Sequence, residues 1–298
     1  MILVIGATGF VGHHLVEELA DLRAPNAAMV RVPARAQGLP STTGYVVGTL
    51  DDPPAVDVLR DFDRVFLMSP THSEQVALET TFIDALVAAA HRPHVVKLAW
   101  DGFDDPACRV RFMHNHRLVA EHLESTGLPV TYVAPNLFME NLLDLADTIR
   151  DEGLLSAPAG EGRAGFVASS DVGAVAARAL TVDDIAAEDG TIHVVTGPES
   201  LSFDDVAARI SAVFAREVDY DDQPVEEARA ALRSQNHPEW HCEGMLELYD
   251  WLRHGGCDTV TEDVPAATGE DARPLQDWLN ELRGAFVGRP QTISPPKF

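Results

Sequence analysis

The first twelve residues constrain the fold of this chain more than any other stretch. Residues 1–5 are continuously apolar, which is typical of a strand buried on both faces. Three glycines follow at once, and the apolar residues after them recur at helical spacing. A strand, a glycine turn and a helix together present backbone N–H groups to a phosphate, so the stretch predicts a dinucleotide site rather than a plain turn. The residues expected to contact the dinucleotide here are Gly6, Thr8, Gly9, Phe10, Val11 and Gly12.

Stretches with strand character then alternate with helical ones up to about residue 150. The further strands are expected at residues 27–31, 44–48, 64–68, 94–99 and 129–134, and the longer helices at residues 73–90 and 109–125. Strands that alternate with helices at this spacing are typical of an α/β fold with a parallel sheet. The sequence therefore predicts a Rossmann-type, doubly wound parallel sheet.

Beyond residue 150 the pattern becomes mostly helical. Helices are expected at residues 171–180, 203–214, 225–232, 239–252 and 274–286, and a strand at residues 191–196. We predict an NAD(P)-binding Rossmann domain over residues 1–150, to which residues 164–197 return. Residues 198–298, with a loop at residues 151–163, should form a smaller, mostly helical substrate lobe. The ligand crevice is expected between this lobe and the strand ends.

The composition excludes several classes of partner. A formal net charge of −25 repels nucleic acid and acidic membrane surfaces. No apolar run approaches the roughly 18 residues of a membrane span, and the first strand leaves no room for a signal peptide. The three cysteines are far apart, and His237, His241 and Cys242 match no zinc-site spacing. We therefore expect a cytoplasmic protein with no metal, no nucleic acid and no membrane partner.

Two arginines follow the second expected strand, where a dinucleotide fold meets the adenosine ribose. An acidic residue at that point favours NAD, whereas arginine accommodates the 2′-phosphate of NADP. Arg31 and Arg35 stand there, with no Asp or Glu between them. The guanidinium fork suits a phosphate, so we predict NADP(H) as the cofactor. The alternative is that both arginines belong to a solvated loop.

Several further motifs, taken in order, resemble the NmrA-like family of atypical short-chain dehydrogenases. That family includes NADPH-dependent quinone reductases and a redox-sensing regulator. The resemblance covers almost the whole chain and implies a Rossmann domain with a small substrate lobe, a preference for NADP(H) and a cytoplasmic protein. The motifs that carry it lie at residues 6–12, 31–35, 48–53, 66–70, 135–141, 171–176, 196–202 and 268–274.

The usual catalytic residues of short-chain dehydrogenases are absent from the sequence. The fifth expected strand ends in Trp100 and Asp101 rather than in Ser or Thr, and the helix at residues 109–125 lacks the Tyr-x-x-x-Lys motif. Related isoflavone-reductase-like enzymes carry a catalytic lysine eight residues before a Glu-x-x-Gly motif. His116 stands eight residues before Glu124, so we predict that His116 exchanges a proton during catalysis. The alternative is a helix-face histidine paired with solvent or a glutamate.

Other residues are expected at the same crevice. Asp101 is a second catalytic candidate if burial raises its carboxyl pKa, although an Asp-Gly pair also forms turns. Trp100 is expected to stack on a flat substrate, and Phe138 to form a wall of the substrate site. The further cofactor contacts that we predict are Ser69, Pro70, Lys97, Asn136 and Phe138.

These features predict an NADPH-dependent oxidoreductase that transfers hydride to a small, neutral, flat acceptor such as a quinone or enone. A quinone can take its proton from water, which fits the missing catalytic set. One alternative is a non-catalytic NAD(P)-sensing regulatory protein that binds a protein partner. Another is a non-redox isomerase, cyclase or dehydratase of secondary metabolism. The expected partner is a small-molecule substrate, and the sequence leaves a homodimer open.

Overall fold

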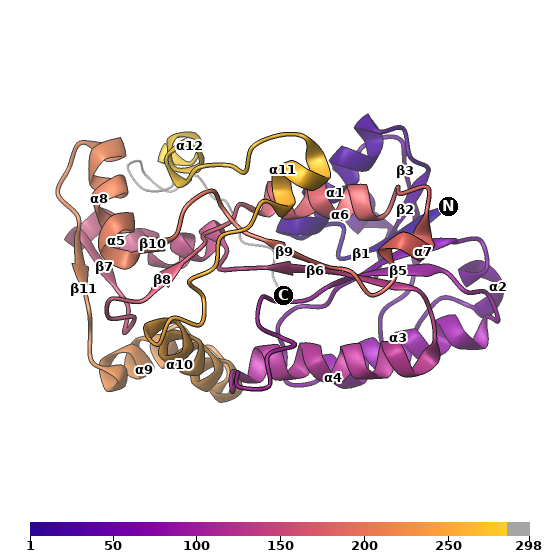
Figure 1. Cartoon of the computed structure of the whole chain (residues 1–298), viewed down its shortest axis with the longest axis horizontal. Coiled ribbons are helices and arrows are strands. Elements are labelled where there is room, and N and C mark those ends of the chain that lie inside the picture. Colours follow the sequence, from indigo (N-terminus) through magenta and orange to yellow (C-terminus); the bar gives the residue numbers. More distant parts are fainter. Residues whose placement is uncertain (285–298) are drawn as a thin grey trace.

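A parallel sheet forms the centre of the computed structural model, which describes residues 1–284. Within these residues seven strands join in the order β3-β2-β1-β4-β5-β6-β9 (Figure 1). The order reverses between β1 and β4, which is where such sheets bind their ligands. The predicted Rossmann-type, doubly wound sheet is therefore confirmed. The strands are β1 (Ile2–Ile5), β2 (Asn26–Val30), β3 (Thr43–Val47), β4 (Arg64–Leu67), β5 (His94–Leu98), β6 (Val130–Pro135) and β9 (Ile192–Val195).

Helices cover both faces of the sheet, which explains why its inner strands are mostly apolar. The side chains of Ile2 and Val4 join one core and those of Leu3 and Ile5 join the other. Figure 1 shows α1, α6 and α11 on one face and α3 and α4 on the opposite face. The helices of this part are α1 (Phe10–Asp21), α2 (Val56–Leu59), α3 (Gln75–Ala88), α4 (Arg111–Thr126), α6 (Ser169–Ala179), α7 (Ile185–Glu188) and α11 (Asp263–Thr268), with the 3-10 helix η1 (Pro33–Ala36).

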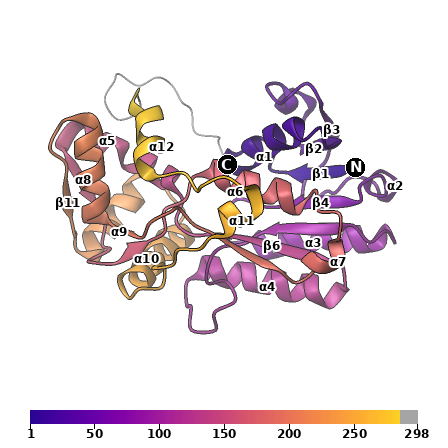
Figure 2. The ribbon, with the colours of Figure 1, turned by 45° about the horizontal axis from the view of Figure 1, so that its top comes forward.

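The remaining elements gather at one end of the sheet (Figures 1 and 2). They form a smaller group that is mostly helical, as the sequence predicts, but the exact domain boundaries stay predictions. Its helices are the 3-10 helix η2 (Met139–Leu145), α5 (Ala146–Glu152), α8 (Phe203–Phe214), α9 (Val225–Ser234), α10 (Glu239–Arg253) and α12 (Leu275–Glu281). Its short strands are β7 (Leu154–Ser156), β8 (Arg163–Ala164), β10 (Leu201–Ser202) and β11 (Asp219–Asp221).

Three features of this second half differ from the sequence predictions. The expected loop at residues 151–163 contains β7, which pairs with the distant strand β11. The helix α11 packs against α6 and β9, so this segment of residues 198–298 lies on the Rossmann sheet. The helix α12 ends at Glu281, and the predicted end at residue 286 lies outside the described residues.

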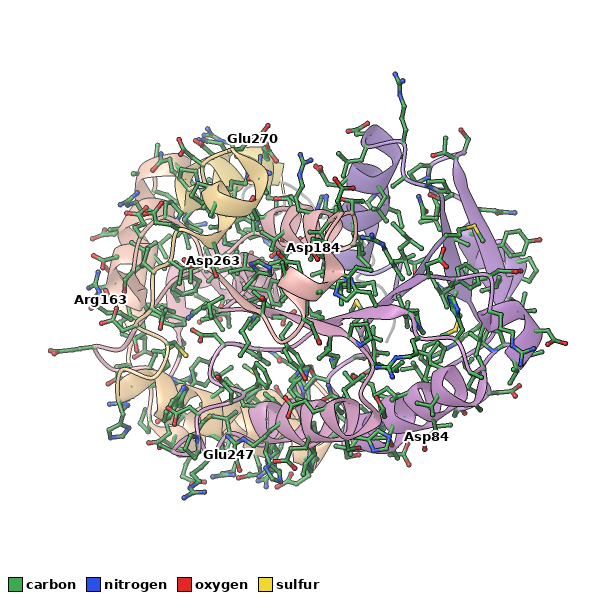
Figure 3. The ribbon with its side chains drawn as sticks, turned by 45° about the vertical axis from the view of Figure 1, so that its right-hand side comes forward. Asp84, Arg163, Asp184, Glu247, Asp263 and Glu270 are labelled. Carbon is green, nitrogen blue, oxygen red and sulfur yellow. The ribbon has the colours of Figure 1, made fainter. Side chains whose placement is uncertain are left out.

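An ion pair fastens α10 to the first turn of α4. The guanidinium group of Arg111 donates to both carboxylate oxygens of Glu247, at 2.9 and 2.5 Å. The backbone N–H of Arg111 also donates to Glu247, at 2.9 Å. The N-cap residue of α4, Val110, has an apolar side chain that cannot accept a hydrogen bond, so Glu247 supplies the acceptor instead. Glu247, labelled in Figure 3, therefore caps a helix that lies far away in the sequence.

No helix within residues 1–284 is at once long enough and apolar enough to span a lipid bilayer.

Candidate functional site

The glycine turn joins β1 to α1 at the point where the strand order reverses. Gly6 adopts a φ of +75°, a conformation that L side chains rarely take. A Cβ atom on Gly12 would overlap the carbonyl oxygen of Gly6 and lie 2.8 Å from the Cα atom of Ala7. The turn therefore packs directly against the first turn of the helix, which only glycine allows.

The N-terminus of α1 is suited to an anion. Among the described residues, no side chain caps the helix at Gly9, and its first turn contains no acidic residue. The N–H groups of the first turn have no partners within the helix, and the helix dipole favours negative charge there. Thr8 and Phe10 are exposed beside this surface. These residues fit the pyrophosphate of a dinucleotide, and their predicted contacts with it stay predictions.

Arg31 and Arg35 lie on the other side of the turn, at the end of β2 and in η1. Both side chains are exposed, and within residues 1–284 neither forms a salt bridge. A hydrogen bond from Thr49 lowers the pKa of the Asp51 carboxyl, and the charge of Arg31 lowers it further. Both guanidinium groups therefore have donors available for a phosphate at the adenosine ribose.

The structure brings Asp101 and Asn136 together where β5 and β6 end. The Asn136 side-chain amide donates to Asp101 Oδ2 at 2.7 Å and to the carbonyl oxygen of Cys257 at 3.1 Å. Burial raises the pKa of the Asp101 carboxyl, although hydrogen bonds from Asn136 and Thr259 act in the opposite direction. Gly102 has a φ of +83°, so the Asp-Gly pair also forms a turn. Both interpretations of Asp101 therefore remain compatible with its position.

Aromatic side chains extend from the end of β5 towards α10. The half-buried ring of Trp100 stacks on Phe112, with ring centroids 5.8 Å apart and an angle of 7° between the planes. Phe112 in turn contacts Trp240, with centroids 5.3 Å apart. Phe138 is half-buried at the start of η2, where its backbone pairs with Val167. The predicted contacts of Trp100 and Phe138 with a substrate stay predictions.

His116 and Lys97 lie in the core between the sheet and the helices α3 and α4. Lys97 is 1% exposed, and its ammonium group lies 2.9 Å from Glu79 Oε2. It also donates to the carbonyl oxygen of Leu98 and lies 3.3 Å from His116 Nδ1. Lys97 therefore already has internal partners, and its predicted contact with the cofactor stays a prediction.

The buried position sets the protonation of His116. Burial lowers the pKa of its imidazole well below the usual value, and the charge of Lys97 lowers it further. Burial also lowers the pKa of Lys97, while Glu79 opposes this effect. His116 is therefore a neutral imidazole at neutral pH. Its ring contacts Gln75 and Lys97, whereas the alternative interpretation expects solvent or a glutamate as its partner. Its predicted role in proton transfer stays a prediction.

Ser69 links this buried cluster to the ends of the strands. It follows β4, is half-buried, and its hydroxyl donates to Glu79 Oε1 at 2.6 Å. The Gln75 side chain donates to the same oxygen at 3.1 Å. Pro70, the next residue, is exposed at the same edge of the sheet.

The sequence predictions missed Glu79 and Gln75. Both lie on the buried side of α3, at the helical spacing that Phe82, Ile83 and Leu86 continue. Two polar residues on an apolar helix face need buried partners, and a lysine inside a fully buried strand needs one too. The presence of both features in one sequence was the signal that could have predicted a buried polar cluster.

We expect the substitution His116→Gln to make the protein less sensitive to acid. The unfolded chain protonates this imidazole below about pH 6.5, whereas the folded state keeps it neutral. Its contribution to stability is therefore complete above that pH and is lost as the pH falls. In the variant, the slope of the free energy of unfolding between about pH 6 and 5 should decrease by about 1.4 kcal/mol per pH unit. Urea unfolding at several pH values measures this slope. The control is His114→Gln on the exposed side of α4; equal slopes in both variants would contradict the expectation.

Within the described residues, no group of three or more His, Cys, Asp or Glu side chains is arranged to hold a metal ion. The rings of His237 and His241 stack on each other with centroids 4.7 Å apart, and Cys242 is buried.

Comparisons with known proteins cover nearly the full chain. A model of the NmrA-like family matches residues 1–277. The chain is 31% identical over 289 residues to the NAD(P)H azoreductase of Xenophilus azovorans, which covers 96% of this chain and 99% of that protein. It is 33% identical over 288 residues to the (4-alkanoyl-5-oxo-2,5-dihydrofuran-3-yl)methyl phosphate reductase of Streptomyces griseus, again covering 96% of this chain and 99% of that protein.

A solved structure shares the fold. The NADPH-dependent quinone oxidoreductase of Escherichia coli, in complex with NADPH, superposes with a TM-score of 0.84 at 21% sequence identity. The match covers 95% of this chain and 100% of that chain. The family resemblance inferred from the sequence motifs is thereby confirmed: the chain belongs to the NmrA-like family.

Proposed function

We propose that this protein is an NADPH-dependent oxidoreductase that transfers hydride to a small, neutral, flat acceptor such as a quinone or enone. The observation that carries the proposal is the similarity, along nearly the whole chain, to two reductases that are each more than 30% identical to it. One of them is named for its use of NAD(P)H. The oxidoreductase class rests on these relatives, and the choice of acceptor rests on the site.

The site supports NADP(H) as the cofactor. When bound, NADPH would supply the hydride, and the protein would hold and orient it. The uncapped N-terminus of α1 would bind the pyrophosphate, and Arg31 and Arg35 would hold the 2′-phosphate. In a chain with a net charge of −25, two exposed arginines at this edge that form no salt bridge within residues 1–284 support a phosphate ligand.

The site also supports a flat and neutral acceptor. Trp100 offers an aromatic ring beside the ends of β5 and β6, where the nicotinamide half would lie. The Asp101 carboxyl at the same place, together with the overall negative charge, disfavours an anionic substrate. The described helix α4 offers neither tyrosine nor lysine as a proton donor. An acceptor that takes its proton from water, such as a quinone, needs none.

The first test is binding and turnover with the purified protein. We expect calorimetry to show tighter binding of NADPH than of NADH, and absorbance at 340 nm to fall when quinones or enones are added. The double variant R31A/R35A should weaken NADPH binding at least about a hundredfold and change NADH binding little, because two charge-assisted hydrogen bonds of about 1.5–3 kcal/mol each are lost. Arg178→Ala on α6 removes a positive charge away from the site and should leave NADPH binding unchanged.

Other outcomes favour the alternatives. Tight NADPH binding without turnover of any acceptor would favour a sensing protein. Conversion of a substrate without consumption of NADPH would favour an isomerase, cyclase or dehydratase. No dinucleotide binding at all would overturn the proposed function.

A further inference from the structure

Glu79 controls which way the Ser69 hydroxyl points. Its Oε1 atom accepts hydrogen bonds from the Ser69 hydroxyl at 2.6 Å and from the Gln75 amide at 3.1 Å. Its Oε2 atom lies 2.9 Å from the Lys97 ammonium group, and both charged side chains are 1% exposed or less. A carboxylate paired with an ammonium group has only acceptors. Ser69 must therefore donate its one proton inward, which leaves the lone pairs of this half-buried hydroxyl available to a donor from outside the cluster.

The position of Ser69 identifies which part of a dinucleotide it can meet. The strand β4 lies between β1 and β5, so Ser69 follows the strand next to the glycine turn. The contact is close: a Cβ atom on Gly6 would lie 2.7 Å from Met68 Sδ. Arg31 and Arg35 lie on the opposite side of the turn, after β2. If those arginines hold the adenosine half, the nicotinamide half extends over β4 towards β5.

We infer that Glu79 is a positioning residue that makes Ser69 a hydrogen-bond acceptor for a donor on the nicotinamide half, either a ribose hydroxyl or the carboxamide NH2. Lys97 holds the Glu79 carboxylate in place for this purpose. The inference rests on the proposed function only in that the protein must bind NADP(H). It does not require that hydride transfer occurs.

The variants Ser69→Ala and Glu79→Gln test the inference. In E79Q, Lys97 should hold the oxygen of the new amide, so that the amide NH2 faces Ser69. The Ser69 hydroxyl then accepts from that NH2 and points its own proton away from Glu79, where it meets the donor of the cofactor instead of accepting from it. Each variant should weaken NADPH binding about threefold to tenfold, the effect of one hydrogen bond. The double variant S69A/E79Q should be no weaker than S69A alone.

A truncated ligand separates positioning from general damage. Adenosine 2′,5′-bisphosphate carries the 2′-phosphate and lacks the nicotinamide half, so calorimetry should show unchanged binding of this ligand in every variant. Asp84→Asn is the matched control, because Asp84 lies on the exposed side of the same helix, paired with His122 at 2.8 Å (Figure 3). It should alter the binding of neither ligand.

Adding K97M to E79Q provides a second, independent test. Without the ammonium group, the amide is free to turn its oxygen towards Ser69 and Gln75, which restores the inward hydrogen bond. NADPH binding should then recover to within about twofold of the unmodified protein. If Glu79 had only a structural role, E79Q/K97M should bind NADPH no better than E79Q, because the double variant changes more of the core.

Three results would overturn the inference: unchanged NADPH binding in E79Q, an equal loss for the truncated ligand, or no recovery in E79Q/K97M. Absence of NADPH binding by the unmodified protein would overturn it together with the proposed function. NADPH binding without turnover would contradict the proposed function alone.

Discussion

Alanine at position 12 is expected to abolish NADPH binding and to lower the free energy of unfolding by about 3 kcal/mol, the upper part of the usual range for overpacking. The added methyl group would overlap the Gly6 carbonyl oxygen, which belongs to the backbone and cannot turn away as a flexible side chain can. The overlap can be relieved only if the turn moves away from α1. This movement removes the N–H surface that a pyrophosphate needs. Urea unfolding followed by circular dichroism measures the stability, and calorimetry measures NADPH binding.

Gly9→Ala is the matched control for this effect. A Cβ atom on Gly9 would lie 3.4 Å from the Gly6 oxygen, which is a tolerable contact, and the backbone angles there suit alanine. We therefore expect the G9A variant to fold with nearly unchanged stability but to bind NADPH at least about tenfold more weakly, because its methyl group occupies the path of the pyrophosphate. Wild-type NADPH binding by G12A would contradict the assignment of the turn.

Lys97→Met is expected to destabilise the protein by about 3–5 kcal/mol, because it leaves the carboxylate of Glu79 buried without its counter-charge. The double variant E79Q/K97M removes both charges and should recover much of that loss. Urea unfolding of the two single variants and the double variant completes a double-mutant cycle. The coupling between the two residues should exceed about 2 kcal/mol.

The pair His122–Asp84 provides a control, because Asp84 lies on the same helix as Glu79. Its atoms approach to 2.8 Å, but both side chains are accessible to solvent, at 32% and 66%. Removing Asp84 should therefore cost no more than about 1 kcal/mol. A coupling between Lys97 and Glu79 as small as that of the exposed pair would show that the buried pair does not hold its site together.

The sequence predicts the sheet well because its strands are buried on both faces. Such strands are mostly apolar, as in residues 1–5 and, apart from His94 and Lys97, in residues 94–99, and short connections leave little choice of topology. The strands β8 and β10 escape prediction because each contains only two residues. Strands this short show no periodicity, and each forms only when a partner far along the chain lies beside it.

The candidate site, like the fold, could be predicted from the sequence only in part. The glycine turn has a local signature, because Gly6 adopts a positive φ and Gly9 and Gly12 both lie close to the Gly6 carbonyl oxygen. The cluster around Glu79 has none, because β4, α3, β5 and α4 each contribute to it. His116 lies in the core because it shares a helix face with Phe112 and Val119, both buried. Its neighbour Lys97 was visible as a charge within a strand, and Glu79 as an acid on an apolar helix face, but nothing local in the sequence pairs the two.

The return of α11 to the sheet and the capping of α4 by Glu247 have a consequence for protein engineering. The polypeptide passes repeatedly between the Rossmann sheet and the smaller group of elements, so no single cut separates the two. A fragment that ends after β9 would lack the cover that α11 gives to α6 and the acceptor that α4 takes from Glu247. Chimeras that exchange substrate specificity between members of this family should therefore be built by grafting several segments together, not by swapping C-terminal halves.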